Sequence, residues 1–371
     1  MKIGDSHLSW CLNIYPGESL EATEKNIFKN APQVADFLCE LGYKRNLDSG
    51  LGLGLRLAAD TVNRLHKNTE NLKNKLEEAR LYAFTVNAFP FGNFHKVPVK
   101  KNVYFPDWSE DSRLNYSIKT GDILDDLLPS DQTYGSISTV PVTYGKKLDL
   151  KTIKNFIKLA EHYKHLEEYS GKVIQMALEP EPDCYLETTS EALEYYNILR
   201  NENQDLTERY LGICLDTCHM ALQFENPSES LQRLIDANVT LPKIQISSVL
   251  RYNNEGNLAP INKYVEPVYL HQTLVKDEEG KIFQYPDLQD AIDDKQYGEW
   301  RIHFHVPLYF EENDFGITST SHLLDENFMK LAFKHCRHLE TETYTFGVLP
   351  NAIDNVNKSI AQEFDYVLRK I

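Results

Sequence analysis

The chain has 371 residues, 42% of them hydrophobic, and its 39 Lys and Arg against 55 Asp and Glu give a net charge of −16 at pH 7. This length and apolar content suffice for one large barrel or two ordinary domains. So acidic a surface repels phosphate backbones and anionic lipid, which argues against nucleic-acid and membrane-surface partners.

The cysteines and the hydropathy indicate a cytoplasmic protein. Six cysteines lie at positions 11, 39, 184, 214, 218 and 336, and no two form a CxxC pair. We predict six reduced thiols, as is usual in a reducing compartment. The chain shows no cationic start with an apolar run, and no window approaches the ~20 apolar residues of a membrane span.

Strand-like apolar runs alternate with amphipathic helices along the whole chain. Strands are predicted at residues 8–12, 51–57, 82–87, 136–141, 173–178, 212–216, 243–247 and 340–346. The clearest helices are predicted around 27–38, 60–76, 112–128, 149–163, 321–335 and 356–367, and Thr188-x-x-Glu191 is a capping box for another.

Eight strand–helix units in one chain favour an α/β fold of the (β/α)8 TIM-barrel type. An open doubly wound sheet is the alternative. No linker rich in Pro, Gly or Ser divides the chain, so we predict a single domain over residues 1–371.

Residues 250–300 interrupt this alternation. Two strand-like runs, 269–275 and 281–285, flank Lys276-Asp-Glu-Glu-Gly280, which predicts an inserted hairpin. Because the insertion leaves from the C-terminal end of a strand, we expect it over the barrel mouth, either as a lid or as surface decoration. A further strand-like run follows at 301–306.

Polar side chains gather at the C-terminal ends of the predicted strands, where a barrel places its active site. Glu179 follows the fifth strand, Asp216 ends the sixth with His219 three residues later, Gln245 lies on the seventh and Glu342 on the eighth. Carboxylates buried together need a cation to offset their repulsion. Oxygen and imidazole ligands indicate one divalent ion, Mn²⁺, Mg²⁺, Co²⁺ or Zn²⁺, and not a cysteine-based zinc site.

The run 301–306 contains two histidines with one residue between them, His303 and His305. Residues two apart in a strand share a face, so both imidazoles are expected to point the same way. A histidine on a half-apolar strand is by default a satisfied core group. Because Gln245 offers only a neutral amide oxygen, we predict that His305 joins the metal site, with His303 one layer below as a substrate contact.

Further candidates for binding a polyhydroxylated substrate follow strands two, three and four; surface placement is the alternative for each. These candidates are Arg56, Asn87, His95 and Tyr144. Glu181 joins them, because it shares a face with Glu179 in a segment that Pro180 and Pro182 keep extended.

The strand-end pattern of Glu179, Asp216-x-x-His219 and Glu342 resembles the metal site of xylose-isomerase-like barrels. Closer still, four segments are similar to the EboE family of metabolite-traffic proteins, and the resemblance runs over nearly the whole chain. These segments are Ser9-Trp-Cys-Leu-Asn-Ile-Tyr-Pro-Gly-Glu18, Gly52-Leu-Gly-Leu-Arg56, Phe89-Pro-Phe-Gly-Asn-Phe-His95 and His303-Phe-His-Val-Pro307.

The resemblance implies a metal-dependent sugar or cyclitol isomerase or epimerase, with Glu179 and Glu342 as the acid/base pair, within a pathway that makes or exports a metabolite. Two departures are visible: Gln245 stands where ketose epimerases usually have a histidine, and Tyr15 where the family implies one.

Two other functions are compatible with the same scaffold. One is a carrier that binds a metabolite without changing it. The other is a DNA-repair nuclease of the endonuclease IV type, against which the net charge of −16 argues. The sequence leaves the oligomeric state open, including a homo-oligomer.

Overall fold

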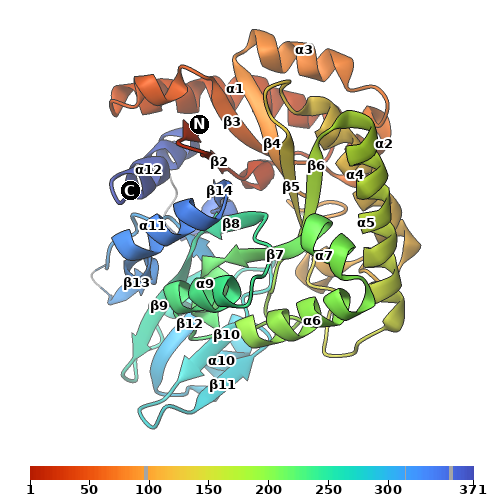
Figure 1. Ribbon diagram of the computed structural model, residues 1–371. Helices are drawn as coiled ribbons and strands as arrows, with labels where there is room; N and C mark the ends of the chain where they lie inside the picture. Colours follow the sequence, from red (N-terminus) through yellow and green to blue (C-terminus); the bar gives the residue numbers. More distant parts are fainter. Residues whose placement is uncertain (96–98, 314, 351–353) are drawn as a thin grey trace.

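The computed structural model describes residues 1–95, 99–313, 315–350 and 354–371, and they form a barrel of parallel strands surrounded by helices (Figure 1). The main sheet has the strand order β1-β2-β14-β8-β7-β6-β5-β4-β3. A parallel bridge between Cys11 and Gly54 links the chain after β2 to β3 at the other end of this order. The predicted TIM barrel is therefore confirmed, and the open doubly wound sheet is not formed.

The elements of the barrel have the following bounds. Its strands are β2 (Ser6–Trp10), β3 (Leu51–Arg56), β4 (Leu81–Asn87), β5 (Tyr134–Thr139), β6 (Val173–Leu178), β7 (Leu211–Asp216), β8 (Lys243–Ile246) and β14 (His338–Thr341), with β1 (Lys2–Ile3) antiparallel to β2. The helices are α1 (Leu20–Glu40), α2 (Ala59–Leu65), α3 (Glu70–Glu78), α4 (Asp111–Leu127), α5 (Leu150–Ser170), α6 (Thr189–Glu202), α7 (Gln204–Tyr210), α8 (Thr217–Leu222), α9 (Pro227–Asp236), α10 (Leu288–Asp294), α11 (Glu326–His335) and α12 (Val356–Leu368). Short 3-10 turns are η1 (Leu12–Ile14), η2 (Lys44–Leu47), η3 (Lys100–Tyr104), η4 (Ile261–Tyr264), η5 (Ser321–Leu323) and η6 (Tyr344–Gly347).

Local sequence signals explain where several helices begin and end. The predicted capping box opens α6: the Thr188 hydroxyl accepts from the Glu191 amide, and the Glu191 carboxylate accepts from the Thr188 amide. Pro227 occupies the first turn of α9, where its missing N–H is no loss. Helix α5 ends at Gly171, whose φ of 74° is left-handed.

Three predicted elements have different bounds in the structure. The last strand ends at Thr341 and not at residue 346, because the chain turns into η6; there Thr345 donates its hydroxyl to the His305 carbonyl. The helix predicted at 60–76 is divided into α2 and α3 at Lys67, whose φ is 66°. The helix predicted from 321 starts as η5, and α11 itself begins after Asp325, which caps it.

The insertion belongs to a second, five-stranded antiparallel sheet with the order β11-β10-β12-β9-β13. Its strands are β9 (Ser248–Asn254), β10 (Thr273–Lys276), β11 (Ile282–Tyr285), β12 (Gly298–Val306) and β13 (Ile317–Ser319). The predicted hairpin is confirmed as β10–β11. It is not a detachable element, since β10 also pairs with β12, the strand that carries His303 and His305. The second sheet has a buried core of its own.

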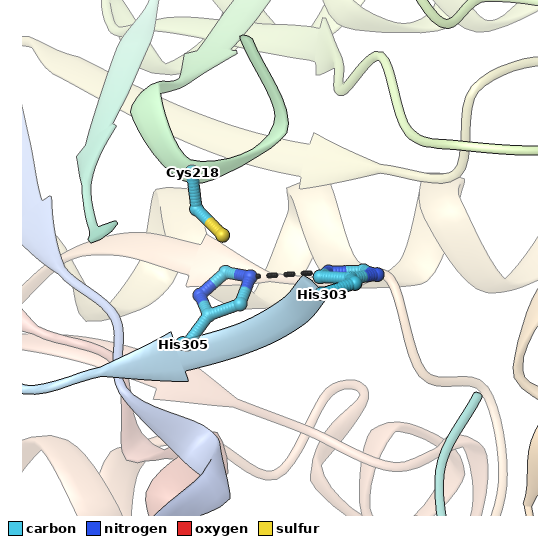
Figure 2. A group of neighbouring side chains, drawn as sticks. All are labelled: Cys218, His303 and His305. Carbon is cyan, nitrogen blue, oxygen red and sulfur yellow. Dashed lines mark hydrogen bonds between the residues drawn. The ribbon is translucent and has the colours of Figure 1, made fainter. Parts of the chain in front are cut away.

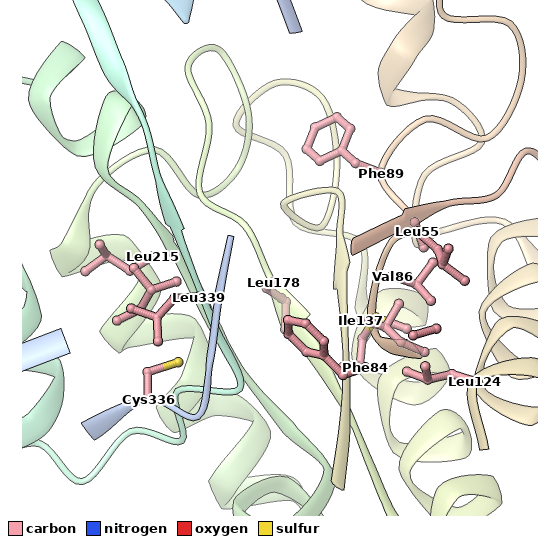
Figure 3. Packing of buried hydrophobic residues seen from close by; sticks show 14 of the residues in the cluster. Leu55, Phe84, Val86, Phe89, Leu124, Ile137, Leu178, Leu215, Cys336 and Leu339 are labelled. Atoms are coloured by element: carbon pink, nitrogen blue, oxygen red, sulfur yellow. The ribbon is translucent and has the colours of Figure 1, made fainter. Parts of the chain in front are cut away.

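Apolar residues of the barrel strands form the main core, part of which Figure 3 shows, with Leu178, Leu215 and Leu339 from three different strands. Some residues that alternate with these apolar ones along the strands are polar and contact each other. Lys243 of β8 and Glu340 of β14 form an ion pair at 2.5 Å with both side chains fully buried. Among the described residues, no helix is long and apolar enough to cross a membrane.

Gly54 on β3 has no side chain, and the Glu340 carboxylate of this ion pair fills the space beside it. A Cβ at Gly54 would overlap Glu340 Oε1 and lie 3.0 Å from the Trp10 carbonyl oxygen. Gly54→Ala is therefore expected to lower the free energy of unfolding by ~1–3 kcal/mol or more, the usual cost of overpacking. Urea denaturation tests this, with Gly347→Ala as the control because no atom of the described residues lies within 4 Å of a Cβ there. Equal stability of the two variants would contradict the expectation.

Candidate metal centre

Three carboxylates from different strand ends meet above the barrel. Glu179 follows β6, Asp216 ends β7 and Glu342 follows β14. One carboxylate oxygen of each lies within 4.8 Å of those of the other two, and all three residues are at most 3% exposed. The register of the parallel strands brings these residues together. Asp216 of β7 and Glu340 of β14 both pair with Gln245 of β8, the strand between them, and Glu342 lies two residues after Glu340.

Asp216 has one oxygen held by the protein and one free. Its Oδ1 accepts hydrogen bonds from the amides of Cys218 at 2.7 Å and His219 at 3.1 Å, which caps α8, and from Ser247 Oγ at 2.7 Å. Burial opposes ionisation, but neighbouring His219 and His305 and these hydrogen bonds hold the pKa of Asp216 below its usual value. Oδ2 is buried without a hydrogen-bond partner among the described residues, so it is available to a cation.

Glu342 and Glu179 differ in how they are held. Glu342 Oε1 accepts from the side-chain amides of Asn13 at 2.7 Å and Asn87 at 2.9 Å. Glu179 Oε1 lies 3.9 Å from His219 Nδ1, and its Oε2 is buried with no partner in the described part of the chain. Burial, followed by the nearby carboxylates, raises the pKa of both glutamates well above the usual value.

These observations fit a divalent cation. Two of the three buried carboxylates have an oxygen without a partner among the described residues. Burial, followed by repulsion between the carboxylates, raises the pKa of Glu179 and Glu342, and a bound cation relieves both effects. Carboxylate oxygens suit Mg²⁺ and Mn²⁺, and added imidazoles suit Co²⁺ and Zn²⁺.

Three histidines lie beside the carboxylates. His305 Nε2 is 3.3 Å from the Nε2 atoms of both His303 and His219. His305 Nδ1 is also 3.8 Å from Glu342 Oε2. Figure 2 shows His303 and His305 side by side on β12, with the Cys218 sulfur directed toward His305. We expected His303 one layer below His305, but His303 itself lines the cavity described next.

A small cavity of about 50 Å³ opens beside these groups, enough for a few water molecules or a cation. It is lined by Asn13, Asn87, Phe89, Pro90, Phe94, Val99, Lys100, Val103, Tyr104, Glu179, Glu181, His219, Tyr269, Leu270, Gln272, His303, Glu342 and Tyr344. The insertion contributes Tyr269, Leu270 and Gln272, and the aromatic loop after β4 faces them. The Lys100–Asp287 ion pair, at 2.6 Å, ties these two segments together.

The structure separates the predicted substrate-binding residues into two groups. Asn87, Glu181 and His303 line the cavity. The others are not among the lining residues, and they contact segments that are. Arg56 donates to the Gly17 carbonyl at 2.9 Å, His95 Nδ1 lies 3.4 Å from Glu18 Oε1, and Tyr144 stacks on Tyr104 with ring centroids 4.9 Å apart.

Gln245 does not present its oxygen to a metal in this structure. Its Oε1 accepts the Cys214 thiol at 3.1 Å, and its Nε2, a donor, has no partner among the described residues. Residues without a sequence prediction hold the site instead. Asn13 and Ser247 fix Glu342 and Asp216, and Gln272 fixes His303 Nδ1 at 2.9 Å. The sequence offered a signal for Ser247, because it is the last residue of the predicted strand 243–247. For Asn13 and Gln272 the only signal was that they are polar.

Comparison with known proteins defines the fold. The chain matches no protein-family model and no curated protein. Among solved structures, a xylose isomerase-like TIM barrel protein from Mycobacterium smegmatis in complex with magnesium is 10% identical, with a TM-score of 0.55 over 98% of this chain and 96% of that one. The fold is that of a xylose isomerase-like TIM barrel.

Two other solved structures are similar at lower TM-scores. D-allulose 3-epimerase from Methylomonas sp. in complex with D-allulose is 12% identical, with a TM-score of 0.49 over 99% of this chain and 97% of that one. An IOLI protein with a zinc atom is 13% identical, with a TM-score of 0.47 over 98% and 96%. With TM-scores below 0.5, these two comparisons carry no argument about this chain.

Proposed function

We propose that this protein is a divalent-metal-dependent isomerase or epimerase that acts on a sugar, a cyclitol or a related polyhydroxylated metabolite. The observation that carries the proposal is the meeting of three buried carboxylates, Glu179, Asp216 and Glu342, with ligand oxygens within 4.8 Å of one another. Two of them have an oxygen with no partner in the described ranges of the chain. The Mycobacterium smegmatis barrel is in complex with magnesium, which supports a divalent cation in a protein of this fold.

A bound divalent cation would hold two neighbouring substrate oxygens and stabilise the negative charge that develops on them when a proton leaves carbon. A buried carboxylate can take a proton from a substrate carbon or return one to it. Glu179 and Glu342 both line the cavity beside Asp216, so we assign them as the acid/base pair. Asn13 and Asn87, which donate to Glu342 Oε1, orient that carboxylate.

The rest of the cavity binds and encloses the substrate. Glu181 and Tyr104, joined by a hydrogen bond of 3.1 Å, offer polar contacts, and Tyr269 and Leu270 form the apolar cover from the insertion. Tyr269 and Leu270 therefore narrow the cavity from the side of the insertion. Enclosure would then exclude water from the reacting carbon.

A turnover screen tests this function. The purified protein is stripped with a chelator and reloaded separately with Mg²⁺, Mn²⁺, Co²⁺ and Zn²⁺, and each form is incubated with ketoses, aldoses and cyclitols. We expect an isomer or epimer to form only with metal. Loss of the acid/base groups in Glu179→Gln and Glu342→Gln should each lower the rate by ~10²–10⁴-fold, the usual contribution of general acid–base catalysis. Unchanged rates in both variants would contradict the assignment.

A metabolite carrier on the same barrel is the second candidate. Two observations favour it: the four segments similar to the EboE metabolite-traffic family, and Gln245, whose oxygen is engaged by Cys214 where epimerases usually have a histidine. A carrier would bind a metabolite in the screen and release it unchanged. A nuclease of the endonuclease IV type is a remote third possibility, and the net charge of −16 argues against it.

A further inference from the structure

His271 lies in the insertion, between two residues that line the cavity, Leu270 and Gln272, and it has a hydrogen-bond acceptor at each ring nitrogen. Its Nδ1 is 2.8 Å from the His303 carbonyl oxygen, and its Nε2 is 2.7 Å from Glu266 Oε1. A carbonyl oxygen only accepts hydrogen bonds, so Nδ1 carries a proton. The proton between Nε2 and Oε1 belongs either to His271 or to Glu266.

The other contacts of Glu266 are those of an ionised carboxylate. Its Oε2 accepts the amide of Val268 at 2.8 Å, and its Oε1 accepts the amide of Tyr269 at 2.8 Å. Burial opposes the ionisation of Glu266, but the hydrogen bonds from His271 and from these amides hold its pKa below the usual value. Because donors on both oxygens favour the charged carboxylate, the shared proton stays on His271 Nε2.

His271 is therefore an imidazolium, with an N–H group at both ring nitrogens. Its side chain is 1% exposed, and its ring stacks on Phe304 with the centroids 3.6 Å apart and 4° between the planes. A cation over the face of an aromatic ring is attracted by the ring quadrupole. A buried charge is costly unless it is paired, and Glu266 supplies the opposite charge.

The surroundings of His271 leave Glu266 as its counter-ion. The His271 amide donates to Asp287 Oδ1 at 3.2 Å, but Asp287 is already paired with Lys100. Burial, followed by neighbouring histidines that include His271, holds the pKa of His303 well below its usual value, so that ring is neutral. Burial also raises the pKa of the nearby phenols, which keeps them neutral; these belong to Tyr264 and Tyr269.

The pair of Glu266 and His271 joins the two ends of a segment that forms part of the cavity wall. Within this segment, residues 266–271, Tyr269 and Leu270 line the cavity. The Val268 carbonyl oxygen accepts the amide of Val99 at 2.8 Å, which docks the segment on the loop after β4. The ion pair thus closes a short loop whose middle residues face the site.

We propose that the His271 imidazolium, held by Glu266, is a positioning group that fixes segment 266–271 in the wall of the cavity and releases it when the imidazolium loses a proton. The inference rests on the proposed function only for the use of the cavity. The charge of His271 and its link to Glu266 depend on no reaction.

The pH dependence of the link follows from its two charges. The link needs an ionised Glu266, whose pKa is lowered in the folded protein, so it is present above that pKa and lost as the pH falls through it. The link also needs both protons on His271, so it is lost as the pH rises far enough to remove one. Segment 266–271 is therefore fixed between these limits and released on the alkaline side.

Nitrogen NMR measures the charge of His271 directly. The ring nitrogens of ¹⁵N-labelled protein are recorded at neutral pH, and the signals of His271 are identified by their loss in His271→Gln. We expect both nitrogens of His271 at the shifts of a protonated imidazolium in the wild type, and one unprotonated nitrogen in Glu266→Gln. Glu326→Gln is the control, because Glu326 pairs with Lys330 at the surface, and it should leave both nitrogens protonated. An unprotonated ring nitrogen in the wild type would overturn the inference.

Hydrogen exchange measured by mass spectrometry tests the positioning role. Exchange of the amides in segment 266–271 is expected to be ~10- to 100-fold faster in Glu266→Gln and in His271→Gln, the effect of losing a hydrogen bond between charged groups. Glu326→Gln should exchange as the wild type does. Wild-type exchange rates in both variants would overturn the role of the pair.

A pH series on the wild type needs no variant and separates positioning from a merely structural role. After correction for the intrinsic pH dependence of exchange, protection of segment 266–271 should fall in step with the loss of the proton from His271, while β6 (Val173–Leu178) stays protected. Protection that does not follow the charge of His271 would overturn the inference. None of these measurements uses a substrate, so a negative turnover screen would contradict the proposed function and leave them unaffected.

Discussion

Asp216→Asn is expected to weaken binding of Mg²⁺ or Mn²⁺ by more than the ~10- to 100-fold that loss of an outer-shell partner costs. The reason is that Asp216 Oδ2 is buried, has no partner among the residues that the structure describes, and carries the charge that a cation needs. Oδ1 is occupied by the amides of Cys218 and His219 and by Ser247 Oγ. Asparagine keeps an oxygen for those three contacts and loses the charge.

Asp216→Ala removes both functions of the residue. Metal binding should then be abolished, and loss of the cap on α8 should cost a further ~1 kcal/mol of stability. Equilibrium dialysis measures the metal, and far-UV circular dichroism should stay unchanged. Asp149→Ala is the matched control, because Asp149 caps α5 in the same way and belongs to none of the potential metal-ligand groups. Full metal occupancy in Asp216→Ala would exclude this site.

The second large effect is on stability. Lys243→Met leaves Glu340 as a buried carboxylate without its cation, and breaking such a pair costs ~3–5 kcal/mol. Burial already raises the pKa of Glu340, against the charge of Lys243, which lowers it. The double variant Lys243→Met/Glu340→Gln should recover much of the loss, since no buried charge remains.

Urea denaturation of the single and double variants measures this coupling. Arg64→Met is the control, because Arg64 pairs with Glu21 at the surface, where an ion pair is worth at most ~1 kcal/mol. A Lys243→Met protein as stable as Arg64→Met would show that the buried pair does not support the fold.

The carboxylates were predictable from sequence because the barrel fixes where strand ends meet. Glu179, Asp216 and Glu342 each follow an apolar run, and parallel strands bring such positions to one edge. The bounds of the last strand were not predictable. The alternating Thr343 and Thr345 fit a strand, but their hydroxyls bond Glu363 and the His305 carbonyl, contacts between segments far apart in the sequence.

Residues in loops were predicted less well, since a loop side chain has no fixed direction from periodicity. His95 lies in the loop after β4 and contacts Glu18. Arg56 ends β3 as Asn87 ends β4, yet it donates to the Gly17 carbonyl and fixes the neighbouring loop. The spacing of His303 and His305 predicted a shared face, but not that Gln272, immediately before β10, would bond His303 Nδ1. Such a contact depends on pairing between β10 and β12, which sequence alone does not specify.

Solvent proton exchange tests the central claim of a metal-dependent proton transfer most directly. The protein is incubated in D₂O with a substrate identified by the turnover screen, or with a panel of ketoses, and deuterium at the carbon next to the carbonyl is followed by NMR. Metal-loaded protein is predicted to incorporate deuterium, and the chelator-stripped protein and Glu179→Gln are not. Binding of a metabolite without any incorporation in the metal-loaded form would contradict the enzyme and support a carrier.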